Sequence, residues 1–198
     1  ERHRVWALDL PGCGHTDKPT DFDQSPDGQV AFLRAFVTAV GLDSFHLVGH
    51  SMGGRLSLGI TRTEPERVRS LTLVSPAVVY DKSVITDELV RERLAFARMP
   101  GAQRAFLRTL RELTTLRGFR RDLVRDLHGW LDEIDLPLMV VWGKQDKLTP
   151  AHHLRFVEQG TQVARKELYD RCGHLPQLEH RDRFNADLCA FLADVDQR

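Results

Sequence analysis

The chain has 198 residues, and its 28 Lys and Arg balance its 28 Asp and Glu. This balance disfavours nucleic acid and anionic membranes as partners, and no apolar run approaches the ~20 residues that cross a bilayer. The three widely spaced cysteines fit neither a disulfide framework nor a zinc site, and the first residues lack the apolar core of a signal peptide. We therefore expect a cytoplasmic protein with a sizeable core that uses no metal and no cofactor.

The first part of the chain alternates between strand-like and helix-like patterns. Residues 4–10 predict a strand, which ends at the turn-forming run Pro-Gly-Cys-Gly-His. Apolar residues recur at helical spacing from 30 to 40, and a glycine that can cap the helix follows them. A strand over 45–48, a helix from 52 to 64 and a strand over 68–74 come next. This β-α-β-α-β order favours a parallel sheet with helices on both faces.

Residues 80–131 interrupt the alternation with helical patterns rich in Arg and Leu. The segment is too long for one crossover between strands, so we interpret it as an inserted helical cap. Residues 1–79 and 132–198 would then form the core. The arginines of the cap fit a solvated face better than an anion-binding site.

The alternation resumes after the predicted cap. Residues 136–142 predict a buried strand, residues 143–150 its loop, and residues 151–158 a helix. Residues 164–169 predict the last strand, and an amphipathic helix follows it. The fold class is therefore α/β, with a mostly parallel central sheet flanked by helices.

A five-residue motif joins a predicted strand to a predicted helix: Gly49, His50, Ser51, Met52 and Gly53. In this context Gly-x-Ser-x-Gly is the nucleophile elbow, a sharp turn that exposes a serine hydroxyl. Small residues at Gly49 and Gly53 would let the strand and the helix pass closely. The helix N-terminus supplies N–H groups and a positive dipole where a negative oxygen would develop. Ser51 is the candidate nucleophile.

Two further residues complete a candidate set, because each follows a different predicted strand. They are Asp146 and His174, and the carboxyl ends of parallel strands meet at one edge of a sheet. Serine is a weak nucleophile until an imidazole takes its proton, and the imidazole needs a carboxylate to orient it. The order Ser, Asp, His is the one found with this elbow. Asp132, Asp135 and Asp170 are weaker candidates for the carboxylate, since none follows a strand in a glycine-bounded loop.

The chain resembles the α/β-hydrolase superfamily in four short segments spread over almost its whole length. These segments are Asp9–Gly14, Gly49–Gly54, Trp142–Asp146 and Cys172–His174. The resemblance implies an α/β-hydrolase fold in which Ser51 is the nucleophile, His174 the general base and acid, and Asp146 the orienting carboxylate. It also implies that the backbone N–H of Met52 forms one arm of the oxyanion hole.

Several other residues are candidates for the surroundings of this site. We expect His50 to support the elbow rather than to react, and we take His50, Leu175 and His15 as possible pocket residues. Cys13 and Cys172 lie near the expected site in sequence, but a thiol nucleophile is disfavoured while Ser51 is present.

Members of this superfamily carry a strand and a His-Gly-type loop ahead of the segment that corresponds to residues 4–10. The loop donates the second oxyanion N–H, and the sequence contains neither the strand nor the loop. Removing that strand would leave unpaired backbone groups along two central strands. We therefore expect the N-terminal strands to be missing and the chain to be a portion of a longer protein.

The serine nucleophile excludes the branches of the superfamily that use aspartate, and it leaves attack on a carbonyl. Our first reading is hydrolysis of a small carboxylic ester, as in a carboxylesterase. The second is carbon–carbon bond hydrolysis in ring-opened aromatics, because residues 171–180 resemble those of meta-cleavage-product hydrolases. Many of those carry an aromatic residue after the histidine, where this chain has Leu175. A reading from another class is a ligand-binding protein that has kept the fold. The sequence does not indicate an oligomeric state.

Overall fold

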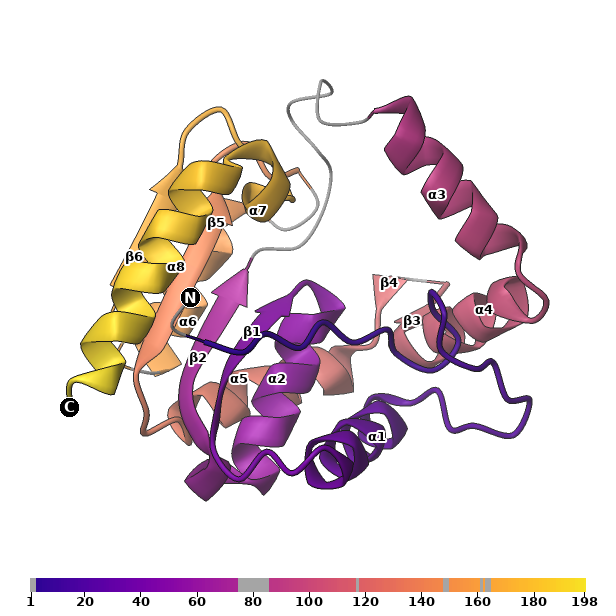
Figure 1. Ribbon diagram of the computed structural model, residues 1–198, viewed down its shortest axis with the longest axis horizontal. Helices are drawn as coiled ribbons and strands as arrows, with labels where there is room; N and C mark the ends of the chain where they lie inside the picture. Colours follow the sequence, from indigo (N-terminus) through magenta and orange to yellow (C-terminus); the bar gives the residue numbers. More distant parts are fainter. Residues whose placement is uncertain (1–2, 75–85, 117, 148–149, 161, 163–164) are drawn as a thin grey trace. The chain divides into compact units, whose positions relative to one another are not determined.

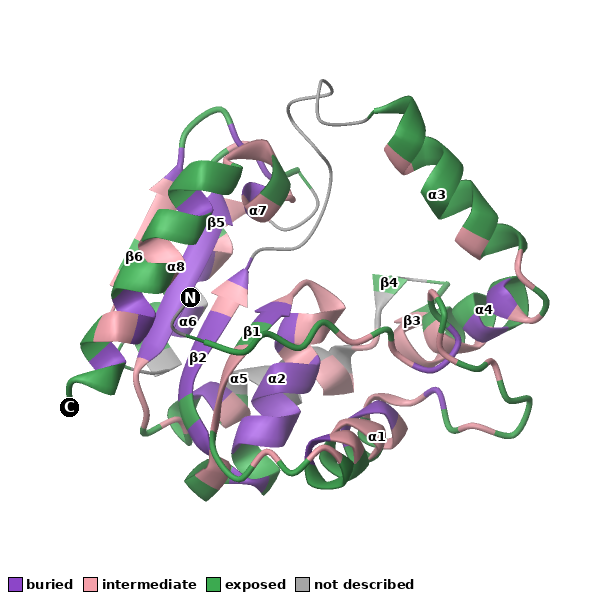
Figure 2. Ribbon diagram, viewed as in Figure 1, coloured by how far each residue is buried: buried purple, intermediate pink, exposed green. Residues whose placement is uncertain are grey.

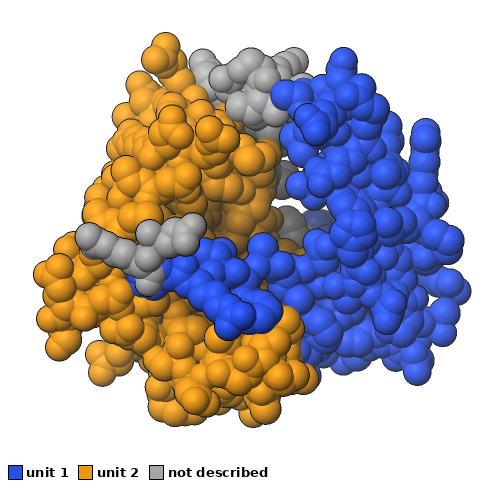
Figure 3. Space-filling model, in the orientation of Figure 1, with its two compact units in different colours: residues 1–32, 85–120 blue, residues 33–84, 121–198 orange. Residues whose placement is uncertain are grey.

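The computed structural model describes residues 3–74, 86–116, 118–147, 150–160, 162 and 165–198 (Figure 1). The chain divides into two compact units (Figure 3). One unit contains residues 1–32 and 85–120, and the other contains residues 33–84 and 121–198. None of the helices in the described ranges is long and apolar enough to cross a membrane.

The larger unit contains a four-stranded sheet in the order β1-β2-β5-β6. The strands are β1 (Phe45–His50), β2 (Val68–Val74), β5 (Leu138–Gly143) and β6 (Arg165–Tyr169). Every neighbouring pair is parallel, with Leu71 beside Leu138 and Val141 beside Glu167 as examples of the register. The predicted parallel sheet is confirmed, and all four strands end at the same edge.

Strand β5 shows why the sheet must have helices on both faces, since all six of its residues are buried (Figure 2). Its alternate side chains enter two separate apolar clusters, as the two-residue period of a strand requires. Met139 and Val141 pack with residues of the C-terminal helix, including Phe184 and Phe191. The other face of β5 contributes Leu138, Val140 and Trp142 to a cluster with Leu58, Leu71, Leu131, Leu154 and Val157. A strand buried on both faces is typical of a parallel sheet.

The helices follow the predicted order. They are α1 (Pro26–Ala39), α2 (Met52–Thr63), α5 (Arg121–Asp132), α6 (Leu154–Gly160), α7 (Pro176–Glu179) and α8 (Arg181–Asp196), with short 3-10 turns η1 (Pro65–Arg67) and η3 (Ala151–His153). Gly41 closes the end of α1 as predicted, and its φ of 67° suits glycine. The Leu42 N–H then donates to the Val37 carbonyl. Helix α2 stops at Glu64–Pro65, because proline cannot continue a helix.

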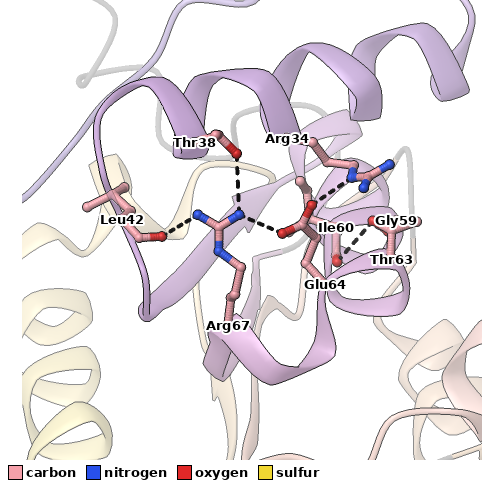
Figure 4. A network of polar contacts seen from close by, with 8 residues as sticks. All are labelled: Arg34, Thr38, Leu42, Gly59, Ile60, Thr63, Glu64 and Arg67. Atoms are coloured by element: carbon pink, nitrogen blue, oxygen red, sulfur yellow. Dashed lines mark hydrogen bonds and ion pairs between the residues drawn. The ribbon is translucent and has the colours of Figure 1, made fainter.

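A buried carboxylate ties α1 to the end of α2 (Figure 4). Glu64 lies 2.7 Å from Arg34 of α1 and 2.6 Å from Arg67 of η1. Arg67 also donates to the Leu42 carbonyl and to the Thr38 hydroxyl. Hydrogen bonds from Arg34 and Arg67 hold the pKa of Glu64 below its ordinary value. These contacts fix the turn that leads into β2, and hence the strand beside the elbow.

The smaller unit joins the N-terminal segment to helices α3 (Asp87–Arg98) and α4 (Ala102–Leu113). The Arg108 guanidinium of α4 donates to the backbone carbonyls of Thr20 and Phe22. A short hairpin of β3 (Thr114–Thr115) and β4 (Gly118–Phe119) follows α4. The sequence pattern did not predict this hairpin, because two-residue strands carry no periodicity.

The predicted strand over residues 4–10 is wrong. None of these residues belongs to a strand in the described part of the chain, and Val5 is 83% exposed. A strand exists only through its ladder of hydrogen bonds, so an apolar pattern without a partner does not make one. The turn that follows is confirmed: Gly12 and Gly14 have positive φ, and the Asp9 carboxylate accepts from the His15 N–H. The predicted helical cap over 80–131 stays a prediction, and residues 75–85 lie outside the described residues.

Candidate active site

Ser51 sits at the turn between β1 and α2 in an unusual backbone conformation. Its φ is 57° and its ψ is −125°, a region that residues with a side chain rarely adopt. The Ser51 N–H donates to the Val74 carbonyl of β2, and the Gly54 N–H donates to the Ser51 carbonyl. The turn is therefore held on both sides, and this fits the strained turn expected of a nucleophile elbow.

Gly49 makes the tight turn possible. A Cβ added there would lie 2.5 Å from the Gly53 carbonyl oxygen and 2.5 Å from the Ser57 hydroxyl oxygen. At Gly53 an added Cβ would meet none of the described residues within 4 Å. The close passage of strand and helix thus depends on Gly49, and the expectation that Gly53 must also be small is wrong.

The loops after β5 and β6 are joined by backbone hydrogen bonds. The Lys144 N–H donates to the Tyr169 carbonyl, and the Gln145 N–H donates to the Cys172 carbonyl, both at 2.9 Å. The Gln145 side chain returns a bond by accepting from the Cys172 N–H at 3.0 Å. These bonds fix the loop that carries Asp146 to the loop that carries His174.

Asp146 and His174 lie beside each other at this junction. Oδ2 of Asp146 is 3.6 Å from Nδ1 of His174. The Asp146 side chain is fully buried, and 14% of the His174 side chain is exposed. Among the described residues His174 Nδ1 has no partner within hydrogen-bond distance. A small rotation of either side chain would shorten the separation to that of a hydrogen bond.

The surroundings of His174 favour its neutral form. Burial of the imidazole, and secondly the nearby His50, lowers the pKa of His174 to about 3. The Asp146 carboxylate acts in the opposite direction, because a negative charge favours the protonated ring. On balance the pKa of His174 is lowered, because burial removes the protonated imidazole from water and so destabilises it. At pH 7 the ring is then neutral and able to accept a proton.

Two residues hold the backbone around His174, and sequence reasoning missed the first of them. The Glu179 carboxylate accepts from the Gly173 N–H at 3.1 Å and from the Leu175 N–H at 3.0 Å. On the other side, His50 Nε2 lies 2.8 Å from the His174 carbonyl oxygen. Glu179 follows Leu175, the residue before α7, by four positions, so its side chain can reach back to the start of this short helix. This spacing is the sequence signal that points to the role of Glu179.

The remaining candidates occupy distinct places. Met52 is the first residue of α2, where backbone N–H groups have no partner inside the helix. Leu175 is half-buried and directly precedes α7. His15 belongs to the smaller unit, where its ring packs edge-on against Phe96 at 4.9 Å. Burial raises the pKa of the Cys172 thiol to about 12, which agrees with the expectation that it is not a nucleophile.

Comparison with known proteins identifies the family. The model of the α/β-hydrolase fold family matches residues 1–117 and 107–181. The chain is 28% identical to a 2-hydroxy-6-oxononadienedioate/2-hydroxy-6-oxononatrienedioate hydrolase of Paraburkholderia phymatum, over 96% of this chain and 76% of that protein. It is 26% identical to a 2-hydroxy-6-oxo-6-phenylhexa-2,4-dienoate hydrolase of Burkholderia cepacia, over 97% of this chain and 78% of that protein.

A solved structure has the same fold. The crystal structure of a serine hydrolase involved in carbazole degradation superposes with a TM-score of 0.80 at 25% identity. The match covers 93% of this chain and 77% of that one. The family model, the relatives and the parallel sheet with its helices agree, so the chain belongs to the α/β-hydrolase fold family and is a hydrolase.

Proposed function

We propose that the protein is a serine hydrolase that splits a carbon–carbon bond in a ring-opened aromatic product, a 2-hydroxy-6-oxo-dienoate. The similarity to dienoate hydrolases favours this activity over hydrolysis of a small ester, the other activity that the sequence predicts. The observation that carries the proposal is the likeness, over 96–97% of the chain, to hydrolases named for such dienoates. A meta-cleavage-product hydrolase is also among the similar folds, at a TM-score of 0.80.

The candidate residues would act in two successive stages, acylation of Ser51 and hydrolysis of the acyl-serine. The Ser51 oxygen adds to the oxo carbonyl carbon while its proton moves to His174, which burial keeps neutral. The bond from that carbon to the dienoate breaks, and the departing carbon keeps the electron pair and takes the proton back from His174. Water then hydrolyses the acyl-serine, with His174 as base again. The net reaction adds one water and releases a carboxylic acid and the shortened dienoate.

Asp146 and Met52 act on charges that develop during this route. The Asp146 carboxylate, 3.6 Å from His174 Nδ1, would orient the ring and stabilise the imidazolium that forms. The Met52 N–H, at the first position of α2, would donate to the oxygen that becomes negative. Both roles rely on groups that are fixed before the reaction, which is the usual source of electrostatic catalysis.

Two substrates, assayed separately, distinguish carbon–carbon bond hydrolysis from ester hydrolysis. We would measure kcat/KM for 2-hydroxy-6-oxo-6-phenylhexa-2,4-dienoate, from the loss of dienoate absorbance, and for p-nitrophenyl acetate. The proposal predicts a higher kcat/KM for the dienoate and no turnover of either substrate by Ser51→Ala. A higher value for the acetate would favour an ester hydrolase. Tight dienoate binding without any turnover would favour a ligand-binding protein.

A further inference from the structure

A second histidine contacts the candidate base. His50 is the last residue of β1 and directly precedes Ser51. Its ring centroid lies 4.3 Å from that of His174, with the two planes inclined at 42°. Its Nε2 lies 2.8 Å from the His174 carbonyl oxygen. Because a carbonyl oxygen only accepts hydrogen bonds, His50 carries its proton on Nε2 and donates it.

We propose that His50 is a positioning residue, which holds His174 in place relative to the elbow and sets the pH range over which His174 accepts protons. This inference rests on the proposed function, in which His174 is the base. His50 does not touch the reacting atoms in this account. It acts through His174.

The positioning role follows from what the hydrogen bond connects. His50 and His174 are 124 residues apart in the chain, and His50 shares a peptide bond with Ser51. One bond therefore links the side chain of the residue before the nucleophile to the backbone of the base. The Glu179 carboxylate accepts from the N–H groups of Gly173 and Leu175, and the His174 carbonyl accepts from His50. The backbone around His174 is therefore held at two N–H groups and at one carbonyl. A restrained backbone keeps the imidazole near Asp146 without an entropic cost at the moment of reaction.

The electrostatic role follows from the ring contact. Among the described residues, the groups that face His174 are Asp146 from the loop after β5, Glu179 from α7 and His50 from β1. The carboxylates favour a protonated His174, whereas a proton gained by His50 disfavours it. Burial is the largest cause of the lowered pKa of His174, and His50 is the second. A proton on one ring therefore opposes a proton on the other.

Three variants distinguish the positioning and electrostatic roles of His50 from a role in folding alone. His50→Gln keeps a donor, because the glutamine Nε2 can reach the His174 carbonyl, but it removes the titratable ring. His50→Leu removes both the donor and the ring. His46→Gln is the matched control, since His46 lies on the same strand and its ring contacts Ser70 and Asp196. The measurements are the NMR titration of the His174 imidazole and the pH profile of kcat/KM.

We expect the midpoint of the His174 NMR titration to move to higher pH in both His50 variants and to stay unchanged in His46→Gln. It also expects kcat to fall about tenfold in His50→Leu, the effect of one lost hydrogen bond, and to stay several-fold higher in His50→Gln. An unchanged His174 titration in both His50 variants would overturn the electrostatic role. Equal kcat in His50→Gln and His50→Leu would overturn the positioning role.

The NMR titration tests the role of His50 independently of the proposed function, because it requires no turnover of substrate. If wild type turns over neither the dienoate nor the acetate, the proposed function fails, but the titration still reports whether His50 acts on His174. If His50→Leu does not fold, His50→Gln still carries the test of the electrostatic role.

Discussion

Gly143 at the end of β5 lies against the backbone of Gly173 in the loop that carries His174. A Cβ on Gly143 would be 2.1 Å from the Gly173 carbonyl oxygen and 2.4 Å from the Cys172 carbonyl oxygen. Backbone atoms cannot move aside as the end of a long side chain can. The close approach of the Asp146 and His174 loops thus depends on the absence of a side chain at Gly143.

Gly143→Ala should therefore separate these two loops. We expect a loss of about 3 kcal/mol in the free energy of unfolding and a loss of most turnover, measured by urea denaturation and steady-state kinetics. Gly129→Ala in α5 is the control, because an added Cβ there meets none of the described residues within 4 Å. Alanine at this exposed helical position should stabilise the protein by up to about 1 kcal/mol. Equal stability of the two variants would contradict the packing argument.

Ser51 should store backbone strain that glycine would relieve. Ser51→Ala and Ser51→Gly both remove the hydroxyl, so both should lose turnover. Because glycine adopts a φ of 57° at little cost, Ser51→Gly should be more stable than Ser51→Ala by about 1–2 kcal/mol. In a chain of this size that difference raises the melting temperature by about 2–8 °C. A less stable Ser51→Gly would show that the turn is not strained.

The lowered pKa of His174 predicts an unusual acid limb of activity. His174 must be neutral to accept a proton, and an unperturbed histidine would lose this ability below about pH 6.5. With a pKa of about 3, kcat/KM should stay nearly constant from pH 7.5 down to about pH 5. An acid limb centred near pH 6.5 would show that burial and His50 do not control His174.

The same shift has a consequence for stability. The unfolded chain binds a proton at His174 below about pH 6.5, whereas the folded protein binds it only near pH 3. The unfolded state thus holds more protons between these values, and the free energy of unfolding falls as the pH drops through this window. His174→Gln should remove this part of the pH dependence, which denaturation at pH 7 and pH 5 would measure.

Glu179 should matter because it accepts from both amides beside His174. Glu179→Ala leaves the Gly173 and Leu175 N–H groups without this acceptor, which should cost about 1–3 kcal/mol of stability and about tenfold in kcat. Glu179→Gln keeps one acceptor oxygen and should be intermediate. Glu158→Ala is the control: its exposed pair with Lys166 contributes at most about 1 kcal/mol. Equal effects at positions 158 and 179 would contradict the role of Glu179.

Much of this fold could be predicted from local patterns. The strand Val68–Val74 is predicted with its exact bounds, because a short run rich in Val, Leu and Thr between proline-containing turns has a strong strand signal. Ser51, Asp146 and His174 are the candidates of the sequence because each follows a predicted strand in a segment that contains glycine, and their roles stay predictions. The parallel sheet then followed from the order of the elements.

Other features depend on contacts that no local pattern reveals. Residues 4–10 look like a strand in sequence but form none in the described chain, so the apolar pattern alone is misleading. The bond from His50 to the His174 carbonyl spans 124 residues, and the contact of Glu179 with Gly173 depends on the exact path of a turn. Such contacts are decided by tertiary packing rather than by residue type.

Covalent labelling of Ser51 tests the central claim most directly. A fluorophosphonate should add once to the wild-type protein, and peptide mass spectrometry should locate the adduct on Ser51. Ser51→Ala should remain unlabelled, and His174→Ala should react at least about 100-fold more slowly, because it lacks the general base. Labelling at another residue, or an equal rate in wild type and His174→Ala, would contradict a nucleophilic Ser51 activated by His174.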